Sequence, residues 1–92
     1  MLLSFSTSQA ATPGDPAAGK AKATLCAACH GPEGISMTDL WPNLAGQKKA
    51  YLEKQIKAFR DEERIDPTML PMVKPLTDQD IKDLAAYYSS LK

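Results

Sequence analysis

The sequence predicts a single all-α domain. Apolar side chains recur at helical spacing near residues 48–60 and 77–91, and no segment nearby shows the apolar and polar alternation of a half-buried strand. A chain of 92 residues has room for one domain with a modest core. Because so small a core rarely suffices alone, we expect a disulfide, a metal or a cofactor to stabilise it.

The first helix is expected to begin at Pro16. Asp15 is a favourable N-cap, and proline is tolerated at the first helical position because its missing N–H has no partner there. We expect this helix to continue through Gly19 and Ala23 into residues 26–30. It should end at 31–34, Gly-Pro-Glu-Gly, since neither Gly nor Pro continues a helix comfortably.

A loop is predicted over residues 31–46, followed by a second helix at about 48–60. The apolar residues at helical spacing in this helix are Tyr51, Leu52, Ile56 and Phe59. Residues 66–76 hold three prolines and two methionines, a composition that predicts a constrained loop without a regular element.

The last helix is predicted to begin after Thr77. Thr77 and Asp80 form a variant of the capping box, in which each side chain bonds the backbone of the other. Apolar residues at helical spacing predict a buried stripe, with Tyr87 beside it: Ile81, Leu84, Ala85, Tyr88 and Leu91.

The motif that carries chemistry is Cys26-Ala27-Ala28-Cys29-His30. Its C-x-x-C-H pattern is the attachment sequence for c-type haem. Residues three and four apart share a helical face, so both thiols and the imidazole should project together. We therefore predict one covalently bound haem c, with Cys26 and Cys29 as its thioether attachments and His30 as an axial iron ligand.

Other readings of the same motif remain open. A structural zinc site needs four Cys or His ligands, and the chain has two Cys and one His in total. A thioredoxin-type dithiol requires a βαβ context. A disulfide between Cys26 and Cys29 leaves His30 unexplained.

The second axial ligand has to come from another residue type, because His30 is the only histidine. Met37 follows it by only seven residues, which makes the opposite face of the ring hard to reach. Met69 and Met72 lie far enough along the chain to return over that face, and the surrounding prolines reduce the entropy that ligation has to overcome. Core packing is the alternative for both, since methionine commonly fills gaps.

Composition limits the partners and the location. Eleven Lys and Arg balance eleven Asp and Glu, so no global field attracts nucleic acid or a membrane surface. No apolar run reaches the 18 residues of a membrane span. Residues 1–10 carry no charge and end in Ser-Gln-Ala, so we interpret them as a remnant of an export signal or a disordered N-terminus. Residues 11–92 are then the haem domain.

The sequence resembles the class I c-type cytochromes, in particular the small bacterial monohaem type related to cytochromes c4, c5 and c553. The resemblance extends over about residues 14–91. It is carried by the haem motif, by Trp41-Pro42-Asn43-Leu44-Ala45-Gly46-Gln47, by 51–60 and by 76–87. It implies the class I cytochrome c fold, with three to four helices wrapped around one haem.

The resemblance also implies roles for single residues. The carbonyl of Pro42 matches the acceptor for the free ring nitrogen of the ligand histidine. Gly19 and Tyr87 match the small and aromatic residues where the first and last helices cross. The count of eight residues before the capping Thr77 selects Met69 as the axial ligand, with Met72 packed near the haem edge.

Four residues are candidates for contacts with the haem propionates: Trp41, Gln47, Tyr51 and Arg60. Core packing explains Trp41 and Tyr51 equally well, and Arg60 has Glu62 and Glu63 as alternative partners. Lys20 and Lys22 on the first helix are candidates for steering redox partners, although exposed lysines usually serve solubility.

The function expected from this reading is electron transfer without enzymatic activity. A soluble periplasmic protein, exported in a bacterium, carries single electrons on a His/Met-ligated haem between respiratory complexes. Its partners are a donor cytochrome or quinol-oxidising complex and an acceptor oxidase or reductase, and the chain is a monomer or a weak dimer. Two alternatives stay open: a haem sensor or peroxide-reactive protein with a labile or missing Met ligand, and an electron-relay module of a larger multihaem enzyme.

Overall fold

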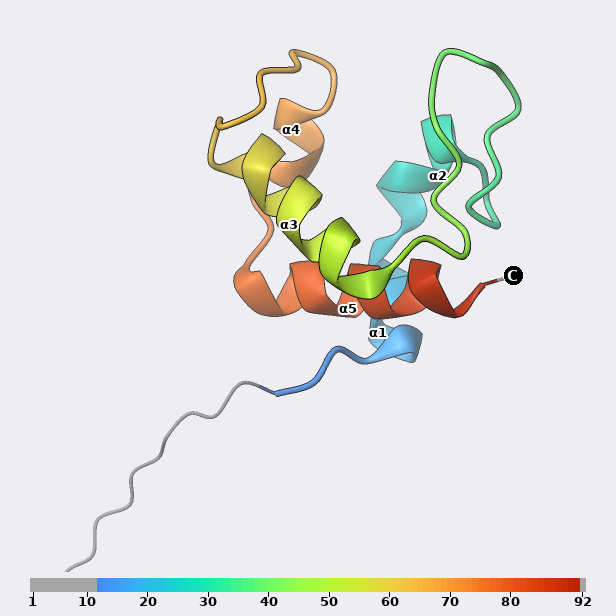
Figure 1. Ribbon diagram of the computed structural model, residues 1–92, viewed down its shortest axis with the longest axis vertical. Helices are drawn as coiled ribbons and strands as arrows, with labels where there is room; N and C mark the ends of the chain where they lie inside the picture. Colours follow the sequence, from blue (N-terminus) through green and yellow to red (C-terminus); the bar gives the residue numbers. More distant parts are fainter. Residues whose placement is uncertain (1–11, 92) are drawn as a thin grey trace, which may run out of the picture.

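The computed structural model describes residues 12–91 (Figure 1). This part of the chain contains helices and loops without a strand, which confirms the all-α prediction. Its helices are α1 (Pro16–Lys22), α2 (Thr24–His30), α3 (Lys49–Arg60), α4 (Leu70–Val73) and α5 (Asp78–Ser90). The predicted export remnant, residues 1–10, lies outside the described residues. Within residues 12–91, the helices are too short or too polar to cross a bilayer.

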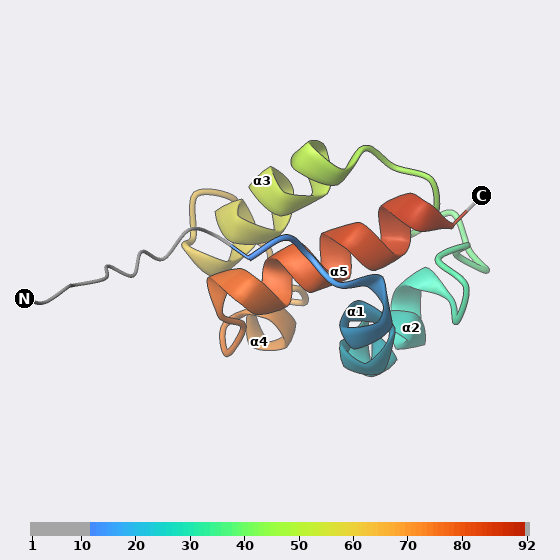
Figure 2. The same ribbon diagram turned by 90° about the horizontal axis from the view of Figure 1, so that it is seen from below.

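Helix α5 is the centre of the fold. α1 and α3 both pack against it, and α4 packs against α3 (Figures 1 and 2). The predicted stripe on α5 is buried at Ile81, Leu84, Ala85 and Tyr88, as is the adjacent Tyr87. These residues remove most of the apolar surface of α5 from water, which stabilises the docking of its neighbours.

The start of α5 has the predicted capping box. The Thr77 hydroxyl accepts a hydrogen bond from the Asp80 amide at 3.0 Å, and the Asp80 carboxylate accepts one from the Thr77 amide at 2.9 Å. Two of the backbone donors that a helix N-terminus leaves free are thus satisfied reciprocally.

The predicted continuous first helix is wrong at one residue. α1 ends at Lys22 and α2 begins at Thr24, because the Ala23 amide bonds to the carbonyl of Lys20 instead of continuing the α-helical pattern. Ala23 is buried and packs in the same cluster as Leu84 and Tyr88. The interruption therefore coincides with the burial of this alanine. After it, α2 forms a separate helix that carries the haem motif.

The predicted loop over residues 66–76 is wrong in part, since residues 70–73 form the short helix α4. Pro71 lies in its first turn, where a missing N–H costs no helical hydrogen bond. This helix and the interruption at Ala23 give five helices in the described part of the chain, where three to four were expected.

The backbones of α1 and α5 touch at Gly19. A Cβ placed on Gly19 lies 2.0 Å from the Asp83 carbonyl oxygen and 2.8 Å from the Tyr87 Cβ, distances that no side chain tolerates. The crossing expected for Gly19 and Tyr87 is therefore present, and the α5 backbone approaches α1 so closely there that only glycine fits.

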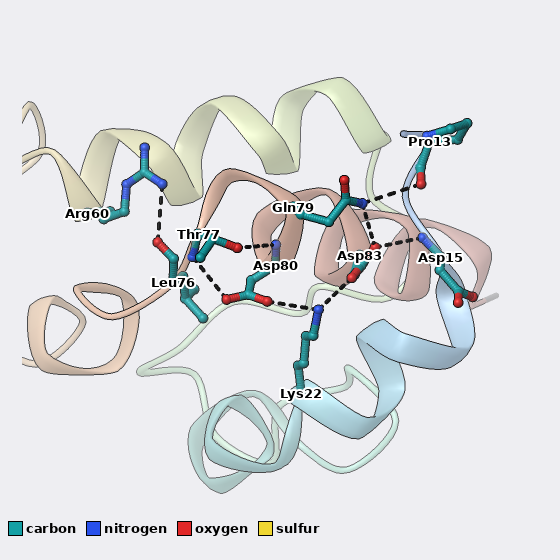
Figure 3. Close-up of polar contacts among 9 residues, drawn as sticks. All are labelled: Pro13, Asp15, Lys22, Arg60, Leu76, Thr77, Gln79, Asp80 and Asp83. Atoms are coloured by element: carbon teal, nitrogen blue, oxygen red, sulfur yellow. Dashed lines mark hydrogen bonds and ion pairs between the residues drawn. The ribbon is translucent and has the colours of Figure 1, made fainter. Parts of the chain in front are cut away.

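A buried carboxylate, Asp83, connects the two helices (Figure 3). It accepts hydrogen bonds from the Asp15 amide at 2.9 Å, from Lys22 Nζ at 2.5 Å and from Gln79 Nε2 at 3.0 Å. Lys22 also pairs with Asp80 at 2.8 Å. The suggested role of Lys22 in steering partners is thus not supported, because its ammonium is committed to α5.

These contacts keep Asp83 charged. Burial disfavours the carboxylate, but Lys22, the Asp15 amide and Gln79 outweigh burial and hold the pKa of Asp83 below its ordinary value of 3.8. A carboxylate whose pKa is lowered by folding stabilises the fold above the ordinary pKa. That contribution disappears as the pH falls through the lower, folded value.

Replacing this carboxylate tests the connection. Asp83→Asn keeps the shape and one acceptor but loses the charge, and we expect it to lower the free energy of unfolding at pH 7 by about 2 kcal/mol. The difference from wild type should shrink as the pH falls below 3.8, because the unfolded carboxyl then takes up a proton before the folded one does, and the contribution is lost as the pH falls through the lower, folded pKa. Guanidinium unfolding of wild type and variant at pH 7 and at about pH 3 measures the loss of stability and its dependence on pH. Asp39→Asn, in the exposed loop after α2, is the control; a difference that persists at low pH contradicts the account.

Candidate functional site

A cavity of about 340 Å³ lies above α5. α2 and α4 border it from opposite ends, and α3 borders it too (Figure 1). Residues from all these helices and from the loop before α3 line it, and most are apolar, including Leu44, Leu52, Ile56, Val73 and Leu84. The cavity is therefore suited to a largely apolar group that contacts both α2 and α4.

α2 brings the three residues of the haem motif into this lining. Cys26, Cys29 and His30 all border the cavity, and both cysteines are half-buried free thiols. Burial raises the pKa of the Cys26 thiol, and the neighbouring Tyr88 side chain opposes that effect in part. Cys26 therefore rests as a protonated thiol.

The turn after His30 depends on Gly31. Gly31 has φ of +86°, and a Cβ there would lie 1.9 Å from the carbonyl oxygen of Ile35. The chain therefore ends α2 and reverses directly after the histidine. The carbonyl of Gly34 accepts from the amides of Leu44 and Ala45, at 2.7 and 3.0 Å, and so closes the loop that carries Pro42.

His30 is buried and its ring is held from the loop. Nδ1 lies 2.8 Å from the carbonyl oxygen of Pro42. A carbonyl oxygen only accepts, so the proton is on Nδ1, and Nε2 keeps its lone pair for a metal. The same contact fixes the orientation of the ring.

Met69 and Met72 line the cavity on the α4 side. The Asp66 carboxylate accepts hydrogen bonds from the amides of Thr68 and Met69, at 2.9 and 3.1 Å. The Met69 carbonyl accepts from the amides of Met72 and Val73, at 2.9 and 3.1 Å. The backbone of Met69 is thus bonded on both sides, whereas the choice between the two thioethers as a ligand stays a prediction.

Three of the four propionate candidates line the cavity: Trp41, Gln47 and Tyr51. Trp41 is half-buried, and Gln47 and Tyr51 are exposed. The side-chain oxygen of Gln47 accepts from the Lys48 amide at 3.1 Å, so its amide nitrogen is left as a donor.

Arg60 is not among the described residues that line the cavity. Its guanidinium bonds Asp61 at 2.9 Å, Asp78 at 2.8 Å and the Leu76 carbonyl at 3.2 Å, the last of which is drawn in Figure 3. The propionate contact suggested for Arg60 is therefore not supported, and neither are Glu62 and Glu63 as its partners. Arg60 instead joins the end of α3 to the start of α5.

Arg64 lines the cavity in its place, and the sequence reasoning missed it. Its guanidinium carbon lies 4.2 Å from the centre of the Phe59 ring, and Nη1 donates to Gln55 Oε1 at 2.6 Å. The chain reaches this position because Glu62 has a left-handed backbone, with φ of +63°, and the amides of Glu63 and Arg64 then bond the Ala58 carbonyl. Such a reversal is usually predicted from a glycine, and the sequence has a glutamate at position 62 instead.

The donor set fits a covalently held haem. Two thiols, one imidazole nitrogen with its lone pair free and two thioethers border a single apolar cavity. Among residues 12–91, the one buried side-chain polar atom without a hydrogen-bond partner, the Tyr88 hydroxyl, belongs to a residue of the same lining. Arg64 adds a cation at the rim for which a carboxylate is the natural partner.

Comparison with known proteins gives the same family. The cytochrome c family model matches residues 16–92. Cytochrome c4 of Thiocapsa roseopersicina is 53% identical over 85 residues, which cover 89% of this chain and 44% of that protein. Cytochrome c-554(548) of Halomonas halodenitrificans is 50% identical over 80 residues, which cover 84% of this chain and 96% of that protein.

A solved structure agrees in fold. Reduced cytochrome c4 from Pseudomonas stutzeri superposes with a TM-score of 0.82 at 41% identity, over 86% of this chain and 46% of that one. The chain thus spans somewhat less than half the length of these cytochrome c4 relatives and nearly all of the cytochrome c-554(548).

The position of Arg64 leads to a prediction with a matched control. Arg64→Gln removes a cation from the cavity rim, so we expect a lower reduction potential of the bound haem, and about 1 kcal/mol less stability because the stacking on Phe59 is lost. Arg60→Gln removes a cation that is paired away from the cavity, so it should lower stability but leave the potential near that of wild type. Protein-film voltammetry and thermal unfolding measure the two effects. Equal shifts of potential in both variants contradict the assignment of Arg64 to the haem site.

Proposed function

This chain belongs to the cytochrome c family, and on that premise we propose that it carries single electrons between redox proteins. The family implies one covalently bound haem c with its iron, and the two cysteines stand at the attachment positions. The observation that supports the proposal best is the shared cavity, which brings both thiols, His30 and the methionines of the α4 side into one lining.

The cysteines are proposed to fix the group to α2. Each thiol would hold one vinyl side chain of the haem as a thioether, its S–H having added across the vinyl double bond. Cys26 and Cys29 then hold the ring beside His30. A covalently attached haem also adds apolar surface to the hydrophobic core, which is small in a chain of 92 residues.

The axial ligands are proposed to be His30 and Met69. Pro42 holds His30 in the tautomer that presents Nε2. The turn at Asp66 fixes the Met69 backbone before ligation, which reduces the entropy cost of a weak thioether bond. Met72 then packs at the edge of the ring.

This ligand set favours electron transfer over catalysis. The haem iron supplies one-electron chemistry, and a thioether ligand favours its reduced form. With His30 and Met69 both bound, no position is left for a substrate. We therefore propose a carrier without enzymatic activity, exported to the periplasm of a bacterium.

The partner surface is proposed to lie where the cavity opens. Leu25 and Leu40 line the cavity and are 60% and 78% exposed, and Ile35 is 51% exposed in the loop between them. Small apolar contacts of this kind suit the weak, brief complexes of redox proteins. The balanced net charge leaves steering to local patches, of which the exposed Lys20 is a candidate.

A second candidate function is an electron relay inside a larger multihaem protein. It is favoured by the share of the cytochrome c4 relatives that the chain spans, 44% for the one from Thiocapsa roseopersicina. The mass and the haem content of the protein purified from its native source distinguish the two: one haem on a chain of about this size supports the carrier, and several haems on one longer chain support the relay.

The carrier predicts a specific absorption spectrum. Expressed with the machinery for c-type maturation, the oxidised protein should show the weak long-wavelength band of a methionine sulfur bound to ferric iron, and the reduced protein sharp low-spin bands. Bound haem with a high-spin spectrum and without that band contradicts the proposal, and a gas sensor or a peroxide-reactive protein then explains the site better.

Two methionine variants test the ligand assignment. Met69→Ala should lose the long-wavelength band, because the sulfur bound to iron is gone, whereas Met72→Ala should keep it and lose only packing. Both variants are matured with haem and compared with wild type by absorption. Loss of the band in Met72→Ala alone reverses the assignment.

A further inference from the structure

The Tyr88 hydroxyl is buried without a partner. Tyr88 is 1% exposed, and within residues 12–91 its hydroxyl is the one buried side-chain polar atom that makes no hydrogen bond. A buried hydroxyl without a partner costs about 1 to 3 kcal/mol. Phenylalanine would fill the same volume without that cost, so the presence of the hydroxyl needs a structural reason.

The acceptor has to lie on the cavity side of α5. Tyr88 borders the cavity, whereas the adjacent Tyr87 does not belong to its lining. Tyr87 instead faces α1, because its Cβ is the atom nearest to Gly19 after the Asp83 carbonyl. A partner for the Tyr88 hydroxyl is therefore to be sought among the side chains that line the cavity and the group attached to them.

Cys26 is the proposed attachment residue that neighbours Tyr88. Its side chain packs against the buried cluster that contains Tyr88, and it borders the same cavity. Burial raises the pKa of the Tyr88 phenol, and a negative charge on Cys26 would raise it further, so the phenol keeps its proton and acts as a donor. A thioether sulfur is an acceptor only, which makes it a suitable partner.

We propose that the Tyr88 hydroxyl donates a hydrogen bond to the Cys26 sulfur once that sulfur is a thioether to the haem. This proposal rests on the proposed function, because it needs the attached group. Tyr88 is a positioning residue: it holds one attachment point from the floor of the cavity.

The contact has a consequence for the redox centre. The hydroxyl turns the positive end of its dipole toward the attachment, and reduction adds one negative charge to the haem. A positive dipole end close to the haem stabilises the reduced state and raises the reduction potential, more strongly in a dry cavity than in water.

The test uses the haem-loaded protein and two matched variants. In the reduced, diamagnetic wild type, proton NMR should show a slowly exchanging hydroxyl resonance with a nuclear Overhauser effect to the Cys26 β-protons. Tyr88→Phe should lose this resonance and have a lower reduction potential, with the long-wavelength methionine band retained. Tyr87→Phe, which removes the neighbouring hydroxyl, should keep both the resonance and the wild-type potential.

The outcomes separate this proposal from the carrier function. A wild type with His/Met absorption bands but without the Cys26 effect overturns the proposal and leaves the carrier function standing, and this measurement needs no variant that folds. Equal shifts of potential in Tyr88→Phe and Tyr87→Phe overturn it too, because a change in packing then accounts for both. A wild type that attaches no haem overturns both the proposal and the carrier function.

Discussion

The contact between the backbones of α1 and α5 at Gly19 is the constraint on which the site depends. A methyl group at this position would overlap the Asp83 carbonyl, so the two helices approach too closely for any residue but glycine. Asp83 then bonds both ends of α1, through the Asp15 amide and the Lys22 ammonium. Because α2 follows α1 after one residue, this crossing also sets where the haem motif lies over α5.

The other segments that line the cavity are also attached to α5. The loop that carries Pro42 is tied to it by the Gly46 amide, which donates to the Tyr88 carbonyl at 2.9 Å. α4 packs against α3, and Arg60 joins the end of α3 to Leu76 and Asp78 at the start of α5. Both sides of the site are thus anchored to α5. The crossing with α1, the Gly46 hydrogen bond and the Arg60 contacts together determine how far His30 lies from the methionines.

The sequence predicted the features that local chemistry determines. Periodicity predicted α3, periodicity together with the capping box predicted α5, and the C-x-x-C-H spacing predicted the three residues that α2 places in the cavity. The interruption at Ala23 was not predictable, since an alanine favours helix and only its burial against α5 accompanies the turn. Arg64 was missed for a similar reason: the reversal that brings it over Phe59 depends on a left-handed Glu62, which no propensity indicates.

Two adjacent tyrosines show how one helix serves the fold and the site together. Successive residues on an α-helix point about 100° apart, so Tyr87 and Tyr88 face different neighbours although their ring centres are 5.0 Å from each other. Tyr87 packs at the crossing with α1, and Tyr88 forms part of the cavity floor. The two rings are neighbours, so the packing at the crossing and the packing of the cavity floor are contiguous. In a protein whose redox properties depend on the surroundings of its haem, the stability of the helix crossing and the environment of the iron are then two consequences of the same packing.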